Sequence, residues 1–134
     1  MRSMKAAFAL CTGYIFTILL EGFARIVITF YHRKTLTFRG ISDLPGIEWA
    51  LLILILTGIT HWFGAMLSTS IYPVHAHRML VAFGILVATG KTIELLTLHA
   101  TEPIWFLGGS MVIALSGVFG AYLIKRNGVT AVSD

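Results

Sequence analysis

Four charged side chains occur within stretches of the chain that are otherwise almost entirely apolar. Glu21 and Arg25 are four residues apart, and Lys91 and Glu94 are three residues apart. Residues at these spacings share one face of an α-helix, so each couple brings together an acid and a base that can pair. An ionisable group at membrane depth costs at least about 2.5–3.5 kcal/mol, and such groups usually pair, face a bundle interior or line a polar path. These four residues are therefore the leading candidates for a site.

The composition indicates that the elements carrying these charges lie in a membrane. Of the 134 residues 57% are hydrophobic and only 12% are charged, whereas soluble domains carry about 25% charged residues. The mean hydropathy of +0.85 agrees. The single cysteine, Cys11, excludes an intramolecular disulfide scaffold. We expect no nucleic-acid partner despite a pI near 9.6, and we expect the lipid bilayer to be the main surrounding.

Apolar runs, continued through the two charged couples, predict four membrane spans. Proline interrupts the pattern twice. Pro73 suits the end of the second span, and Pro103 suits the start of the fourth. Residues 127–134 are polar and are expected to form a flexible tail. The prediction is an all-α, single-domain membrane four-helix bundle over residues 1–134, with spans at about 6–31, 47–71, 78–98 and 103–124.

Four spans place both termini on the same side of the membrane. That side carries five basic residues at or beyond the ends of the spans, namely Arg2, Lys5, Arg78, Lys125 and Arg126, and the opposite side carries three, namely Arg33, Lys34 and Arg39. The excess predicts that both termini are cytoplasmic. We therefore expect a multi-pass membrane protein.

The first and third spans run in the same direction, so the depths of their charges can be compared. At a rise of 1.5 Å per residue, Glu21 lies about 22 Å and Lys91 about 20 Å from the start of its span. If the two helices touch, the four residues would form one cluster of zero net charge. Three interpretations are open: a structural set of ion pairs, a proton or ion pathway through Glu21, Glu94 and His61, or a docking site for a partner helix.

Small and polar residues at helical spacing predict the faces on which the other two helices pack. Such patterns let helix backbones approach closely where no hydrophobic effect drives association. In the second span the stripe consists of Thr57, His61, Gly64 and Ser68. In the fourth it consists of Ser110, Ala114, Gly117 and Ala121.

The histidines raise the question of a cofactor. Only His61 lies well inside a span, and the third span passes its level near Gly84 and Ile85, neither of which can ligate iron. Two histidines of this chain are therefore not expected to hold a haem. A single axial bond from His61 to a haem or chlorin shared with another subunit stays open, although the main expectation is no cofactor. An absorption spectrum of the purified protein would decide this point.

His75, His77 and Arg78 lie at the entry to the third span. Two imidazoles without a nearby cysteine or carboxylate make an incomplete metal site, so the main expectation is no metal. We favour contact with lipid headgroups, in which Arg78 would meet phosphate.

No catalytic signature is present in the sequence. It contains no Gly-x-Ser-x-Gly, no Walker loop, no His-Glu-x-x-His and no dinucleotide fingerprint. We therefore expect no enzyme and no catalytic residue. The leading hypothesis is an accessory or stabilising subunit of a larger membrane complex, which binds other membrane subunits or further copies of itself. The alternatives are a small transporter or an ion- or proton-conducting oligomer that uses the charge cluster, and a haem- or chlorin-associated redox or photosynthetic subunit that uses His61.

The stretch from Tyr72 to Arg126 resembles a known family. It contains Pro73, an arginine at 78 that opens a span, Gly84-Ile85 one to two turns later, Lys91 near the outer end, His99 with Pro103 in the next loop, and a closing Leu-Ile-Lys-Arg. In these features it resembles the phosphate-starvation-inducible protein E family of small four-span bacterial membrane proteins. In this sequence Lys91 replaces the arginine more usual in that family. The resemblance implies four spans in a bacterial inner membrane and no catalytic residue that could be carried over.

Overall fold

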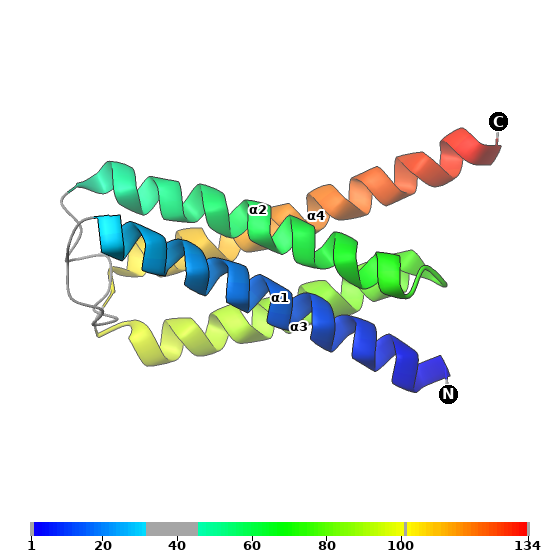
Figure 1. Cartoon of the computed structure of the whole chain (residues 1–134), viewed down its shortest axis with the longest axis horizontal. Coiled ribbons are helices and arrows are strands. Elements are labelled where there is room, and N and C mark those ends of the chain that lie inside the picture. The colour runs from blue at the N-terminus through cyan, green and yellow to red at the C-terminus, as the bar shows by residue number, and fades with distance from the viewer. Residues whose placement is uncertain (1, 32–45, 101, 134) are drawn as a thin grey trace.

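Four long helices make up the part of the chain that the structure, a computed structural model, describes, namely residues 2–31, 46–100 and 102–133. They are α1 (Arg2–Tyr31), α2 (Ile47–Ile71), α3 (Ala76–Leu98) and α4 (Ile104–Ser133) (Figure 1). Each contains a segment that is long and apolar enough to cross a membrane. The predicted all-α fold with four helices is therefore confirmed, and the helices fit a multi-pass membrane protein.

The helix ends differ from the predicted spans mainly at the two termini. Helix α1 begins at Arg2 rather than at residue 6, and α4 continues to Ser133, through most of the segment expected to be a flexible tail. No proline follows Pro103, so nothing in the backbone chemistry forces the last helix to stop where the apolar run ends. The basic residues at 33, 34 and 39, which enter the orientation argument, lie outside the described residues.

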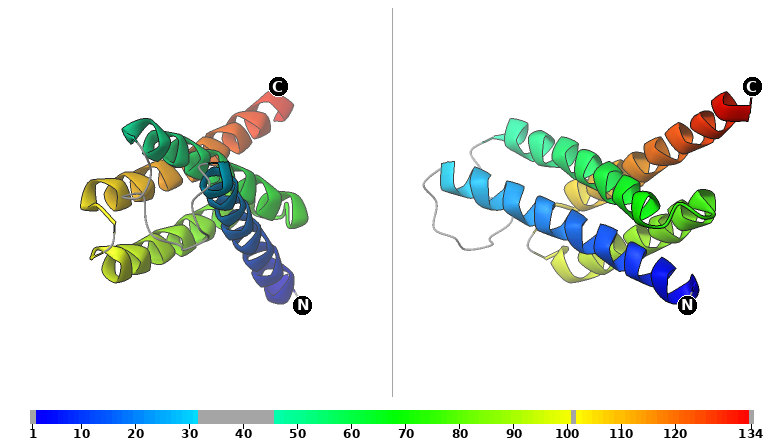
Figure 2. Two further views of the ribbon diagram at one scale, coloured as in Figure 1. Left: turned by 60° about the vertical axis from the view of Figure 1, so that its left-hand side comes forward. Right: turned by 45° about the vertical axis from the view of Figure 1, so that its right-hand side comes forward.

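Helix α2 occupies a central place in the bundle. It packs against α1 on one side and α4 on the other, while α3 packs on α4 and closes the ring against α1. Both termini lie at the same end of the bundle, where the first part of α1 and the last part of α4 diverge (Figures 1 and 2). The order around the bundle is therefore α1, α2, α4, α3, which makes α1 and α3 neighbours.

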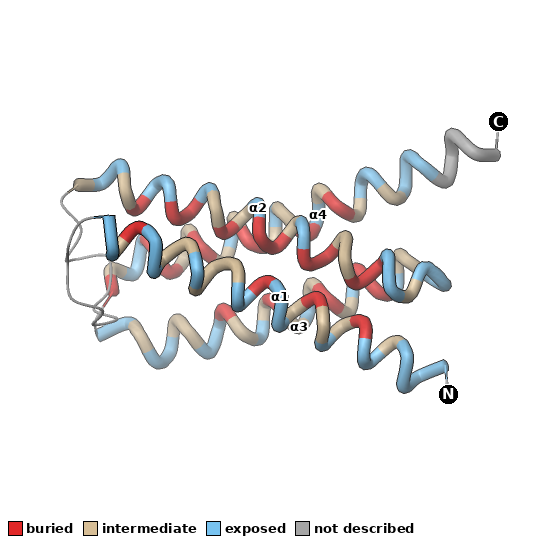
Figure 3. The backbone as a smooth tube through the Cα atoms, viewed as in Figure 1, coloured by how far each residue is buried: buried red, intermediate tan, exposed pale blue. Residues whose placement is uncertain are grey.

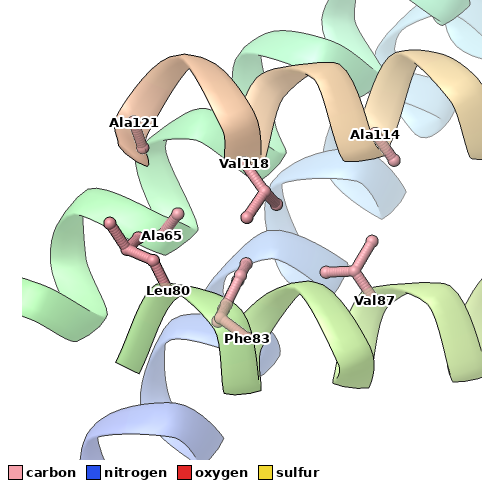
Figure 4. Packing of buried hydrophobic residues seen from close by; sticks show 7 residues of the cluster. All are labelled: Ala65, Leu80, Phe83, Val87, Ala114, Val118 and Ala121. Atoms are coloured by element: carbon pink, nitrogen blue, oxygen red, sulfur yellow. The ribbon is translucent and has the colours of Figure 1, made fainter. Parts of the chain in front are cut away.

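The buried residues of each helix lie on the side that faces the other helices, and the outward sides remain apolar (Figure 3). One buried cluster joins α2, α3 and α4 around Phe83 (Figure 4). A second lies around Phe106, nearer to the start of α4. The outward apolar side chains suit contact with lipid, and the two clusters fix which helix faces turn inward.

Glycines bring α2 close to both of its main neighbours. A Cβ atom added to Gly64 would collide with Thr17 Oγ1 of α1 and lie 2.8 Å from the carbonyl oxygen of Gly13. On the other side, a Cβ atom added to Gly117 of α4 would collide with the carbonyl oxygen of Gly58. The backbones of α2 and its neighbours can approach this closely only because these positions carry no side chain.

Candidate functional site

The contact between α1 and α3 joins the two charged couples in one network. Lys91 Nζ lies 3.2 Å from Oε1 and 3.5 Å from Oε2 of Glu21, and 3.0 Å from Oε2 of Glu94. Arg25 Nη2 lies 3.4 Å from Glu21 Oε1. All four residues singled out in the sequence therefore lie in a single ion-pair network that crosses two helices.

Glu102, which follows α3 and precedes α4, is a fifth member that the sequence reasoning missed. Its Oε1 accepts a hydrogen bond from Arg25 Nη1 at 3.5 Å. The backbone N–H of Glu102 donates to the carbonyl oxygen of Leu98. Glu102 therefore continues the four-residue spacing that runs from Glu94 to Leu98. That four-residue spacing was the available signal.

The four predicted residues carry zero net charge, and the fifth residue, Glu102, adds one negative charge. The network alternates in sign in the order Glu94, Lys91, Glu21, Arg25 and Glu102. With all five groups ionised, three carboxylates and two cations leave a formal charge of −1. One charge in a largely buried network therefore has no counterpart among these five groups.

The network lies inside the bundle, although its burial is uneven. The side chains of Lys91 and Glu102 are 4% and 5% exposed, whereas that of Glu94 is 39% exposed. Arg25 is directed at two carboxylates, and its guanidinium carbon lies 6.0 Å from the centre of the Phe106 ring. The arginine thus directs its charge toward carboxylates inside the bundle.

Helix α2 contributes one hydroxyl to the network. Thr57 Oγ1 lies 3.2 Å from Glu21 Oε1 and 2.9 Å from the carbonyl oxygen of Ile53. The hydroxyl has a single hydrogen, so it donates to one of these two oxygens at a time. Glu21 is therefore the central acid, contacted from α1, α2 and α3.

The polar stripe of α2 continues from Thr57 toward the end of the bundle that carries the termini. His61, Gly64 and Ser68 are all buried, and Ser68 Oγ donates to the carbonyl oxygen of Ala9 at 3.0 Å. On the facing side, Thr17 Oγ1 donates to the carbonyl oxygen of Gly13 at 2.9 Å. Backbone carbonyls thus satisfy these hydroxyls, and the close approach of α1 and α2 leaves the stripe closely packed.

His61, a member of this stripe, is buried, with 2% of its surface exposed. Its Nδ1 lies 2.7 Å from the carbonyl oxygen of Thr57, so Nδ1 carries the hydrogen in this contact. Within residues 2–31, 46–100 and 102–133, no group of three or more His, Cys, Asp or Glu residues could hold a metal. Axial ligation by His61 to a group shared with another subunit stays a prediction.

The residues at the entry to α3 lie apart from the network. His75 is exposed in a left-handed backbone conformation with φ of 57°, and Arg78 is exposed as well. The His77 ring packs edge-on against Tyr122 of α4, with ring centres 5.2 Å apart. The two histidines and Arg78 thus lie at the end of the bundle that holds the termini, where contact with headgroups stays the prediction.

The small residues of α4 face inward. Ser110, Ala114 and Ala121 are buried, and Gly117 lies against the backbone of Gly58 in α2. Within the described part of the chain, Ser110 Oγ has no hydrogen-bond partner. The face therefore serves helix contact and offers no converging set of polar atoms.

Fold and site together define a class: a small bundle of four helices, each long and apolar enough to cross a membrane, with a buried ion-pair network near the end of the bundle away from the termini. Comparison of the chain with protein-family models, with curated proteins and with solved structures finds no match.

Proposed function

We propose that this chain is a non-catalytic membrane protein that acts as an accessory or stabilising subunit of a larger complex in a bacterial inner membrane. The observation that carries the proposal is the pairing of the intramembrane charges with one another. Lys91 contacts two carboxylates, and Arg25 contacts two as well. Groups arranged in this way stabilise the arrangement of helices and are not displayed toward a substrate.

The outward surface supports assembly with other membrane proteins. Helix α1 is the least covered of the four helices, and large side chains such as Phe8, Leu19 and Phe23 are exposed along it. In a bilayer this face meets either lipid or another helix. Cys11 lies exposed on the same helix and offers a natural site for cross-linking.

The test is purification of the full chain from its native membrane in a mild detergent, with cross-linking through Cys11. We expect a particle larger than one 14.7 kDa chain, containing either a second membrane protein or further copies. A Cys11→Ser variant provides the cross-linking control. Migration as a single chain with no protein bound would contradict the proposal.

A second candidate function, ion or proton conduction by an oligomer, is favoured by the unequal number of acids and bases in the network. Proteoliposomes carrying a pH-sensitive dye would test it directly. Conduction predicts a flux that disappears in Glu21→Gln or Glu94→Gln and persists in Glu48→Gln, since Glu48 lies exposed at the start of α2. If the wild-type protein gives no flux above empty vesicles, the conduction hypothesis fails.

A further inference from the structure

Glu102 is the least well compensated acid of the network. Its side chain is 5% exposed, and its nearest cation contact, to Arg25 Nη1, is 3.5 Å long. Its second oxygen, Oε2, is buried and has no hydrogen-bond partner among the described residues. A carboxylate that is removed from water and left with an unpartnered oxygen is costly, and protonation removes most of that cost.

The other two acids are better placed to stay ionised. Glu21 contacts both Lys91 and Arg25 and also lies beside the Thr57 hydroxyl. Glu94 lies 3.0 Å from Lys91 and is more than one-third exposed, so water also solvates it. One added proton would bring the network to equal numbers of positive and negative charges. Because Glu102 has the weakest ion pairing of the three acids, neutralising it removes the least stabilising interaction.

We propose that Glu102 is a proton-binding site, and that the resting protein holds it as a neutral carboxylic acid. The charged groups that act on it are Arg25 from α1 and Lys91 and Glu94 from α3. Loss of the proton turns Glu102 into an anion that competes with Glu21 for Arg25. The proton on Glu102 therefore controls how firmly Arg25 is held against Glu21. The proposal depends on neither of the two candidate functions.

The titration of Glu102 agrees with this geometry. Burial raises the pKa of its carboxyl above the usual range; Arg25 offsets part of the rise and Glu94 adds to it. A folded-state pKa above the unfolded one means that the folded chain binds the proton more tightly. This stabilisation is full at pH below the ordinary carboxyl pKa and is lost as the pH rises through the raised value.

Infrared difference spectroscopy of the protein in lipid vesicles tests the proposal, because a protonated carboxyl has a C=O stretch that shifts in D₂O. The chain has only six acidic residues, so single Glu→Gln variants can assign the band. We expect an acid band at neutral pH that disappears at higher pH and is missing in Glu102→Gln. The exposed Glu48→Gln, which lies outside the network, serves as the matched control and should retain it.

Thermal unfolding provides a second readout that does not depend on the band. Glutamine resembles a protonated glutamate, so Glu102→Gln should have the same unfolding midpoint as the wild type at low pH. At higher pH the wild-type midpoint should fall as Glu102 loses its proton, whereas the midpoint of the variant should not. Absence of an acid band in the wild type, survival of the band in Glu102→Gln, or a lower midpoint for this variant at low pH would each overturn the proposal. So would a midpoint that follows sodium concentration at constant ionic strength and not pH, because a metal cation would then occupy the site.

Discussion

At the scale of single residues, Lys91 is the cation on which the network most depends. It is 4% exposed and lies within 3.2 Å of one carboxylate oxygen of Glu21 and 3.0 Å of one of Glu94. Removing one partner of a buried ion pair leaves the other charge without compensation, which costs far more than the pair contributes in net stability.

Lys91→Met should therefore destabilise the bundle by about 3–5 kcal/mol, because it leaves Glu21 and Glu94 without the ammonium group. Reversible unfolding in mixed detergent micelles measures the change. Lys5→Met, at an exposed position of α1, is the matched control and should change stability by less than about 0.5 kcal/mol. Equal effects of the two substitutions would show that Lys91 contributes nothing specific.

Arg25 bridges two acids through two different nitrogens, Nη2 to Glu21 and Nη1 to Glu102. A lysine at this position has one nitrogen and cannot reproduce the forked geometry. We expect Arg25→Lys to lower stability by roughly 1–3 kcal/mol even though the charge is kept. The exposed Arg78→Lys is the comparison, and a similar loss there, measured by the same unfolding assay, would argue against a bridging role.

At the scale of helices, the interface between α1 and α2 depends on backbone contact. A Cβ atom on Gly13 would collide with Ser68 Oγ and lie 2.6 Å from the carbonyl oxygen of Gly64, whereas a Cβ atom on Gly22 meets nothing within 4 Å. A glycine-to-alanine substitution in α1 should therefore lower stability at position 13 and not at position 22.

Gly13→Ala should cost about 1–3 kcal/mol, since the added methyl group forces α1 away from α2. Gly22→Ala should leave stability unchanged or raise it by up to about 1 kcal/mol, because alanine restricts the unfolded chain more than glycine does. Unfolding midpoints of the two variants, measured side by side, check both. A neutral Gly13→Ala would mean that the two helices are less closely packed in the protein than the structure places them.

At the scale of the whole molecule, the four helices place both termini at one end of the bundle, and the excess of basic residues predicts that this end is cytoplasmic. Reporter fusions at each terminus should be active only as cytoplasmic reporters, and a fusion within residues 32–45 should report the opposite side. Termini on different sides would contradict the four-span topology, and both termini outside would contradict the charge argument alone.

The scarcity of charge and the length of the apolar runs were enough to predict four helices, because a bilayer admits only long segments whose backbone groups are satisfied internally. Spacing alone also placed Glu21 and Arg25 on one face, and Lys91 and Glu94 on another. The helical rise then matched the depths of Glu21 and Lys91. These are properties of one helix at a time, and local sequence determines them.

Tertiary structure decided which helices are neighbours and which side chains meet. The sequence left open whether α1 touches α3. Nor does the sequence indicate that Glu102 reaches Arg25 across 77 positions of the chain, because helical spacing relates residues of one helix and not residues of two. Periodicity describes the face of a helix but not the partner of that face. The partner depends on how the helices pack, for example on the close approaches at Gly64 and Gly117. The same packing brings Glu102 to Arg25, and this third acid turns a balanced cluster into a network with one negative charge in excess.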